Sequence, residues 1–131
     1  MTGPVDEAGG YAVLVVDDDA TLRDLYAQLL REQGFRVETA ADGAEAVQAV
    51  RRSRPDLVLM DYEMPVLDGL AAAREIRALP GAPPPIVMIS SRGDAATRAA
   101  AAAAGIARYL VKPVSLAALQ SVVADHVAAR R

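Results

Sequence analysis

The sequence predicts an α/β domain in which helices cover both faces of a parallel β-sheet. Short apolar runs alternate with amphipathic helical stretches five times along the chain. Successive strand–helix units of this kind are joined by right-handed crossovers, which make the sheet parallel. The 131 residues correspond to one domain, and 53% hydrophobic residues are enough for a buried core. The chain contains no cysteine, which excludes disulfides and thiolate metal sites.

The first strand–helix unit begins at residues 12–16, AVLVV, a continuous apolar run typical of a strand buried on both faces. The apolar residues that follow recur at the spacing of one helix face: Leu22, Leu25, Tyr26, Leu29 and Leu30. Gly34 is expected to end this helix as a C-terminal cap. Residues 35–39 alternate between apolar and polar side chains, which predicts a strand nearer the edge of the sheet.

The second and third helices flank a buried strand. Asp42 and Glu45 resemble a capping box that opens a helix through about Arg52. Residues 56–61, DLVLMD, have the length and composition of a short buried strand. A loop rich in turn residues then leads into a helix over roughly residues 68–78.

The last two units follow the same plan. Residues 86–90, IVMIS, predict a fourth strand, and the alanine-rich run 95–104 is a strong helix former that Gly105 ends. Residues 107–111, ARYLV, predict a fifth strand. Ser115 is expected to cap the final helix.

Composition and charge exclude several classes of protein. Residues 1–10, MTGPVDEAGG, predict a disordered tail before a domain at 11–131, and they lack the basic start and apolar stretch of a signal peptide. No apolar run approaches the ~20 residues of a membrane span. The net charge of −3 argues against direct nucleic-acid binding. We therefore expect a cytoplasmic protein that contacts neither nucleic acid nor a membrane.

Charged and polar residues stand at the ends of four of the predicted strands. Asp17 and Asp18 follow the first strand, Asp61 ends the third, Ser90 ends the fourth and Lys112 follows the fifth. Ligands of open parallel sheets bind at the carboxyl ends of the strands, so these side chains are expected to converge. Carboxylates with open coordination positions are typical of Mg²⁺ sites, and hydroxyl and ammonium groups are donors to phosphate oxygens.

Each of these residues also has a structural interpretation when taken alone. Asp19 is a plausible helix N-cap, and a serine after a strand is common. Lys112 is harder to explain in this way, because it is the only lysine among 14 basic residues. Its compact ammonium is not interchangeable with the planar fork of arginine, which suggests a chemical requirement at this position.

Four segments together resemble the receiver domain of two-component response regulators: VVDDD, LVLMDYEMPVLDG, IVMISS and YLVKP, in the family's order and spacing. The resemblance covers the chain from about Tyr11 to Ala129. It implies a flavodoxin-like, doubly wound fold of five strand–helix units with strand order 2-1-3-4-5. It also implies that Pro113 follows a cis peptide bond, which X–Pro bonds permit.

The resemblance implies roles for the strand-end residues. Asp61 would be the phosphoacceptor, taking a phosphoryl group from the phosphohistidine of a histidine kinase or a histidine phosphotransfer protein. Mg²⁺ would be bound by Asp61 and Asp18, by Asp17 mainly through water, and by the backbone carbonyl of Glu63. Lys112 would pair with Asp61 and then with the phosphate. The protein would not be an enzyme toward other substrates, although it would catalyse its own phosphorylation and dephosphorylation.

The resemblance further implies a switch that controls a protein partner. Ser90 would move toward the phosphoryl group, and Tyr109 would follow it. This movement would change the face formed by the helix at 95–104, the strand at 107–111 and the last helix. Glu63 and Arg92 are either solvated rim charges or residues that modulate dephosphorylation. The protein would be a monomer or a phosphorylation-dependent dimer.

Three alternatives remain open at this point. The chain is also compatible with a degenerate receiver that acts only as an interaction domain. A phosphatase of the haloacid dehalogenase type would use Asp17, Asp19 and Thr21 as its D-x-D-x-T motif, but that family needs an acidic motif beyond its lysine, where only Asp125 is found. Finally, the start and end of the chain favour a stand-alone receiver over a fragment of a longer regulator.

Overall fold

The computed structural model describes residues 10–130, and the predicted tail lies outside them except for Gly10. Strands and helices alternate as the sequence predicts. The bounds are β1 Ala12–Val16, α2 Ala20–Glu32, β2 Arg36–Ala40, α3 Gly43–Ser53, β3 Leu57–Asp61, α4 Gly69–Arg77, β4 Ile86–Ser90, α5 Ala95–Ala103, β5 Arg108–Val111 and α6 Leu116–Arg130. The predicted bounds agree with these to within two residues.

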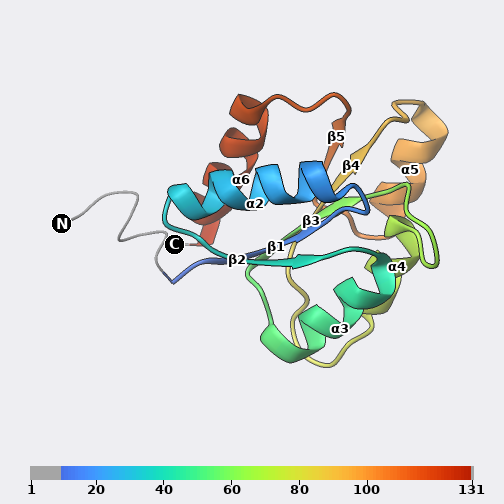
Figure 1. Cartoon of the computed structure of the whole chain (residues 1–131). Coiled ribbons are helices and arrows are strands. Elements are labelled where there is room, and N and C mark those ends of the chain that lie inside the picture. Colours follow the sequence, from blue (N-terminus) through green and yellow to red (C-terminus); the bar gives the residue numbers. More distant parts are fainter. Residues whose placement is uncertain (1–9, 131) are drawn as a thin grey trace.

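The five strands form one parallel sheet in the order β2-β1-β3-β4-β5, which confirms the predicted topology. β2 lies at one edge, as its alternating sequence predicts, while β3 is buried along its whole length at the centre. Figure 1 shows the strands running side by side with their carboxyl ends at the same edge of the sheet. This edge therefore collects the residues that follow β1, β3, β4 and β5.

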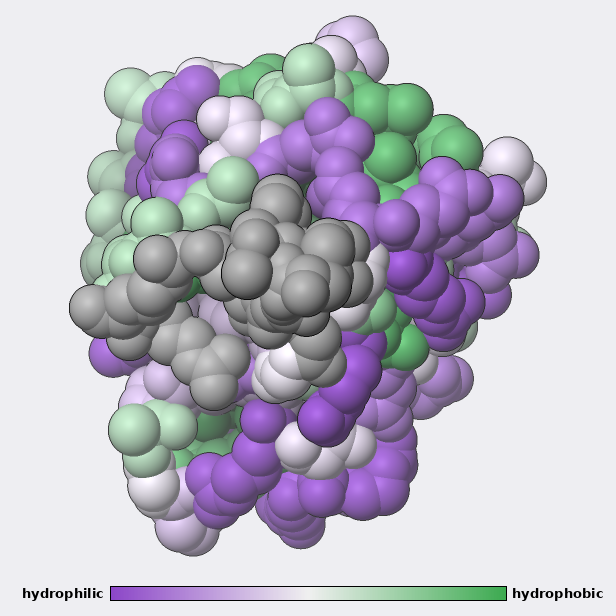
Figure 2. Space-filling model, turned by 90° about the vertical axis from the view of Figure 1, so that its left-hand side faces the viewer, coloured by the Kyte–Doolittle hydropathy of each residue, from purple (hydrophilic) through white to green (hydrophobic). Residues whose placement is uncertain are grey.

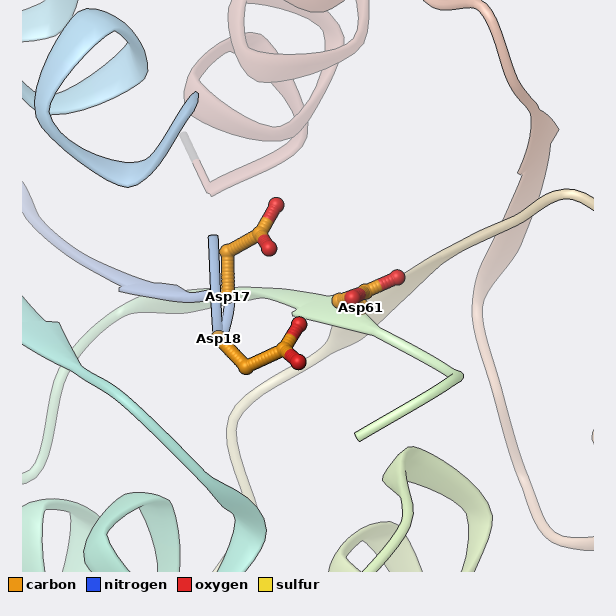
Figure 3. A group of neighbouring side chains, drawn as sticks. All are labelled: Asp17, Asp18 and Asp61. Atoms are coloured by element: carbon orange, nitrogen blue, oxygen red, sulfur yellow. The ribbon is translucent and has the colours of Figure 1, made fainter. Parts of the chain in front are cut away.

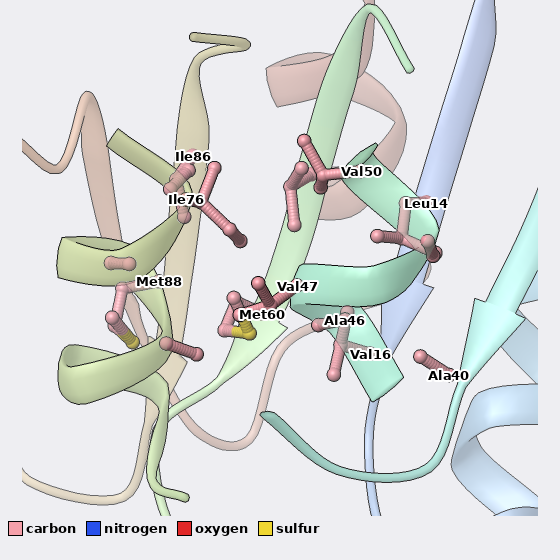
Figure 4. Packing of buried hydrophobic residues seen from close by; sticks show 14 residues of the cluster. Leu14, Val16, Ala40, Ala46, Val47, Val50, Met60, Ile76, Ile86 and Met88 are labelled. Carbon is pink, nitrogen blue, oxygen red and sulfur yellow. The ribbon is translucent and has the colours of Figure 1, made fainter. Parts of the chain in front are cut away.

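Helices cover both faces of the sheet. α2 and α6 lie on one face, and α3 and α4 lie on the other, with α5 beside α4 (Figure 1). Alternate residues of each central strand enter the two layers: Val13 and Val15 of β1 pack toward α2 and α6, while Leu14 and Val16 pack toward α3. Figure 4 shows the second of these layers. Two apolar cores thus fix the central strands whose ends carry the candidate site.

Aspartates begin four of the helices. The side chains of Asp19, Asp42, Asp68 and Asp94 accept hydrogen bonds from backbone N–H groups in the first turn of the helix that follows each of them. The predicted capping box needs one correction, because Glu45 accepts from the N–H of Ala41 and not from that of Asp42. The N–H of Glu45 does donate to Asp42, so the forward half of the motif is present.

The end of the molecule opposite the strand carboxyl ends has a mixed surface. Hydrophilic residues form a broad band across its right and lower parts, and hydrophobic residues gather at its upper edge (Figure 2). Among the described residues, no helix is both long enough and apolar enough to span a membrane.

Candidate functional site

Three carboxylates converge at the carboxyl edge of the sheet. Asp17 and Asp18 directly follow β1, and Asp61 is the last residue of the neighbouring strand β3. One oxygen from each lies within 4.8 Å of the others. Figure 3 shows the three carboxyl groups close together at the ends of the two strands. The predicted convergence is confirmed for these residues.

The environments of the three carboxylates differ. Asp18 is exposed, whereas Asp17 and Asp61 have only 4% and 3% of their surface accessible. Asp17 accepts a hydrogen bond from the N–H of Asp19 at 2.9 Å, which orients its carboxylate. Burial raises the pKa of Asp17 above its usual value, and the Asp19 hydrogen bond only partly opposes this effect. The cluster therefore carries negative charge in a place where charge is costly.

Lys112 supplies the compensating positive charge. Its Nζ lies 2.7 Å from Oδ1 of Asp61, and its backbone N–H donates to the Ser90 carbonyl at 2.8 Å. The peptide bond from Lys112 to Pro113 is cis, as the family resemblance implies. Burial would lower the pKa of Lys112, but the carboxylates of Asp61 and Asp17 raise it above its usual value.

Asp61 remains incompletely satisfied in spite of this ion pair. Burial raises its pKa to about 6, with Asp17 adding to the effect and Lys112 opposing it. Within the described part of the chain, the buried Oδ1 has no hydrogen-bond partner besides its ion-pair contact. A buried carboxylate oxygen of this kind, among neighbouring carboxylates, has the chemistry of a ligand for a hard cation.

Ser90 is fully buried, but its hydroxyl makes no hydrogen bond to Asp61. It donates to Oε2 of Glu63 at 2.6 Å and accepts from the backbone N–H of Arg92 at 3.0 Å. Glu63 also accepts from the N–H of Ser91 at 3.2 Å. Burial of the Glu63 carboxylate is outweighed by these hydrogen bonds, which lower its pKa. Glu63 is therefore more than a solvated rim charge.

Tyr109 is tied to the same loop as Ser90. Its hydroxyl donates to the backbone carbonyl of Arg92, and the guanidinium of Arg98 lies 5.1 Å from the centre of its ring. The ring is half-buried and packs against the α3–α4 core. Arg92 thus contributes its backbone N–H to Ser90 and its carbonyl to Tyr109. The two predicted switch residues, Ser90 and Tyr109, are therefore both hydrogen-bonded to the backbone of Arg92.

A hollow of about 470 Å³ lies beside the acidic cluster. Its lining residues come from the ends of β1, β3 and β4: Asp18, Tyr62, Glu63, Met64, Pro65, Asp68 and Arg92. The start of α4 packs tightly here, because a Cβ added to Gly69 would lie 2.4 Å from the carbonyl oxygen of Asp61. The hollow borders the acidic cluster through Asp18.

Sequence reasoning missed two contacts that shape this site. Arg23 of α2 donates to the backbone carbonyl of Asp17 at 2.9 Å and so holds the loop after β1. The Ser91 hydroxyl lies 3.4 Å from Oε1 of Glu63 and joins two loops. No motif marks either contact, although an arginine in the first turns after a catalytic loop is a weak signal that such a bond is possible.

Asp19 bears on the phosphatase interpretation. Its carboxylate accepts from the N–H groups of Thr21 and Leu22 and is the N-cap of α2. The D-x-D-x-T interpretation uses this residue as the second aspartate of its nucleophile motif. Instead, the structural role expected for an N-cap is confirmed.

Comparison with known proteins agrees with this arrangement. Residues 13–124 match the model of the response regulator receiver domain family. Among curated proteins, the chain is 43% identical over 107 residues to the transcriptional regulatory protein PrrA of Mycobacterium tuberculosis, covering 82% of this chain and 46% of that protein. It is 42% identical over 123 residues to PdtaR of the same species, covering 91% of this chain and 59% of that protein. The chain spans about half the length of these relatives.

Solved structures show the same likeness. The receiver domain of a sensor histidine kinase from Pseudomonas aeruginosa, determined with a magnesium ion coordinated in its active site cleft, is 36% identical with a TM-score of 0.82; the match covers 91% of this chain and 98% of that one. The Borrelia burgdorferi CheX–CheY complex with beryllofluoride and Mg²⁺ contains a chain that is 28% identical with a TM-score of 0.77, with 91% and 87% covered. Motifs, topology, site geometry and family match agree, and the chain belongs to the response regulator receiver domain family.

Proposed function

We propose that the protein receives a phosphoryl group on Asp61 from the phosphohistidine of a histidine kinase or a histidine phosphotransfer protein. The observation that carries this proposal is the buried Asp61 carboxylate, which is ion-paired with Lys112 and clustered with Asp17 and Asp18. Asp18 also lines a hollow beside the cluster. The cytoplasm is the compartment where such a donor would be met.

The transfer is a displacement at phosphorus. A carboxylate oxygen of Asp61 forms the new P–O bond, while the P–N bond to the donor imidazole breaks and its electron pair stays on the ring nitrogen. The product is an acyl phosphate. Phosphoryl transfer depends on positioning and on neutralisation of oxygen charge more than on acid–base chemistry. The role of Lys112 is to remain within reach of Asp61 and to neutralise an oxygen of the transferred group.

The residues at this site fit a Mg²⁺ ion. Asp18 and Asp61 are the proposed direct carboxylate ligands, with Asp17 acting mainly through water and the backbone carbonyl of Glu63 completing the protein's share. Mg²⁺ takes few protein carboxylates and keeps several waters, and the exposed Asp18 is suited to such a partly hydrated ion. When bound, the ion would supply positive charge to the carboxylates and to the phosphoryl oxygens.

The added charge would then bias a two-state switch. A phosphoryl group carries about −1.5 to −2 charges and three strong acceptor oxygens, which favour a new position of the Ser90 hydroxyl. Ser90 and Tyr109 are both bonded to the backbone of Arg92, so movement of one affects the other. We propose that the face of α5, β5 and α6 changes as a result and controls a downstream protein or dimerisation.

Intact-mass spectrometry tests the phosphoacceptor assignment. The protein is incubated with acetyl phosphate, with Mg²⁺ or with excess EDTA, beside Asp61→Asn. We expect one added phosphoryl group that requires both Mg²⁺ and Asp61. If the adduct hydrolyses too quickly to be seen, Mg²⁺-dependent binding of beryllofluoride replaces it as the readout. Failure of both would leave a receiver fold that acts only as an interaction domain.

A further inference from the structure

Glu63 joins the loop after β3 to the loop after β4. Its Oε2 accepts from the Ser90 hydroxyl at 2.6 Å, and its Oε1 accepts from the Ser91 N–H at 3.2 Å. Glu63 is itself exposed, whereas Ser90 is fully buried, so the carboxylate closes over the hydroxyl from the solvent side. Neither bond is implied by the pattern of residues that defines the family.

The Ser90 hydroxyl has a single proton to donate. In this structure that proton goes to Glu63, and the oxygen accepts from the Arg92 N–H. A phosphoryl oxygen on Asp61 would need the same proton. The Glu63 carboxylate and the phosphoryl group are therefore competing acceptors for one donor.

We propose that Glu63 is a positioning residue that holds Ser90 in the unphosphorylated arrangement and must release it before Ser90 can bind the phosphoryl group. This inference rests on the proposed phosphoacceptor function and adds its regulation. A short hydrogen bond to an ionised acceptor is stronger than one between neutral groups. Loss of the bond between Ser90 and Glu63 therefore makes the activated arrangement less favourable in free energy. The population of the activated arrangement is set in part by this bond.

A simpler explanation has to be separated from this one. The Glu63 carboxylate would also repel a phosphoryl group through space, with no involvement of Ser90. Repulsion depends only on the charge of Glu63, whereas the competition depends on the presence of the Ser90 hydroxyl. A double-mutant cycle separates the two, because only a direct coupling makes the two substitutions non-additive.

The experiment measures the affinity for beryllofluoride, in saturating Mg²⁺, of the wild type, Glu63→Ala, Ser90→Ala and the double variant. We expect Glu63→Ala to tighten binding roughly tenfold in the Ser90 protein, about 1.4 kcal/mol, and by less than about twofold when Ser90→Ala is present. Equal tightening in both backgrounds, or none, would overturn the proposal. If the wild type itself binds no beryllofluoride, the phosphoacceptor function fails first.

Two further variants sharpen the result. Glu63→Gln removes the charge but keeps an oxygen acceptor, so it should tighten binding clearly less than Glu63→Ala; repulsion alone predicts that the two are equal. Glu75→Ala removes the same charge from an exposed position on α4 and should have no effect on beryllofluoride affinity.

Hydrogen exchange tests the bond between Glu63 and the Ser91 N–H in the protein without ligand. Exchange of the Ser91 amide should accelerate in Glu63→Ala. Unchanged exchange would contradict the hydrogen bond, even if Ser90→Ala abolished ligand binding.

Discussion

The side chain of Lys112 reaches across the end of β4 to contact Asp61 at the end of β3. Lys112 follows β5, and β5 is not a neighbour of β3 in the sheet, because β4 lies between them. The Nζ–Oδ1 distance of 2.7 Å therefore requires a long side chain that spans the end of β4. This ion pair brings the side chain of Lys112 to Asp61, the proposed phosphoacceptor, while the backbone N–H of Lys112 donates to the carbonyl of Ser90.

Replacement of the charge at Asp61 should stabilise the fold. Burial and the neighbouring Asp17 raise the pKa of Asp61 to about 6, so its ionised form is unfavourable at neutral pH. Asp61→Asn should raise the free energy of unfolding at pH 7 without Mg²⁺ by about 1–3 kcal/mol. Urea denaturation measures this change. Asp125→Asn, which loses only an exposed ion pair with Arg108, should stay within about 0.5 kcal/mol.

The difference in unfolding free energy between Asp61→Asn and the wild type should increase as the pH rises. The pKa of Asp61 is raised in the folded state, so its contribution to stability is fully present below pH 3.8 and is lost as the pH rises through about 6. The stability of the wild type relative to Asp61→Asn should therefore fall between about pH 4 and pH 6. A stability difference that does not vary with pH would contradict the assigned pKa. Mg²⁺ should reduce the stability advantage of Asp61→Asn over the wild type at neutral pH, because the ion favours the ionised Asp61 carboxylate.

Lys112 should not be replaceable by arginine. The planar guanidinium cannot reproduce the contact of a compact ammonium with Asp61, although it carries the same charge. Lys112→Arg should slow phosphorylation by acetyl phosphate by roughly 100-fold, a typical loss when one charge-stabilising donor is removed. Arg108→Lys is the matched control, since it makes the reverse exchange at an exposed position on β5, the strand that Lys112 follows. Comparable rates for Lys112→Arg and the wild type would show that charge alone is sufficient.

Gly69 should be essential for the geometry at Asp61. A Cβ at this position would lie 2.4 Å from the Asp61 carbonyl oxygen, so backbone must move. Gly69→Ala should destabilise the protein by about 1–3 kcal/mol and also slow phosphorylation. Gly93→Ala, whose nearest neighbour would be a side-chain methyl of Val111 at 3.4 Å, should cost much less. Thermal denaturation of the two variants, followed by the phosphorylation assay, makes the comparison.

Much of this architecture follows from the sequence because burial leaves a clear pattern. A strand covered on both faces, such as residues 12–16, must be continuously apolar, so the polar residues that end it stand out. The parallel topology then brings Asp17 and Asp61 to the same edge. The order of the strands required the family resemblance, since many orders satisfy the same alternation of elements.

The contacts of Glu63 and Tyr109 could not be predicted in the same way. Both depend on the path of the loops after β3 and β4, where a change of one backbone angle redirects a side chain. Sequence reasoning left Glu63 either as a solvated rim charge or as a residue that modulates dephosphorylation. Neither interpretation specifies that its carboxylate accepts hydrogen bonds from Ser90 and Ser91. The hydroxyl of Tyr109 likewise donates to the backbone carbonyl of Arg92, and no residue pattern predicts this bond.

Phosphorylation of Asp61 is tested most directly by identifying the residue that carries the phosphoryl group. Borohydride reduces an aspartyl phosphate to homoserine, so peptide mass spectrometry of the phosphorylated and reduced protein locates the site. We expect reduction at position 61 alone, dependent on Mg²⁺ and absent from Asp61→Asn. Reduction at Asp17 or Asp18 instead, or Mg²⁺-dependent phosphorylation that persists in Asp61→Asn, would contradict it.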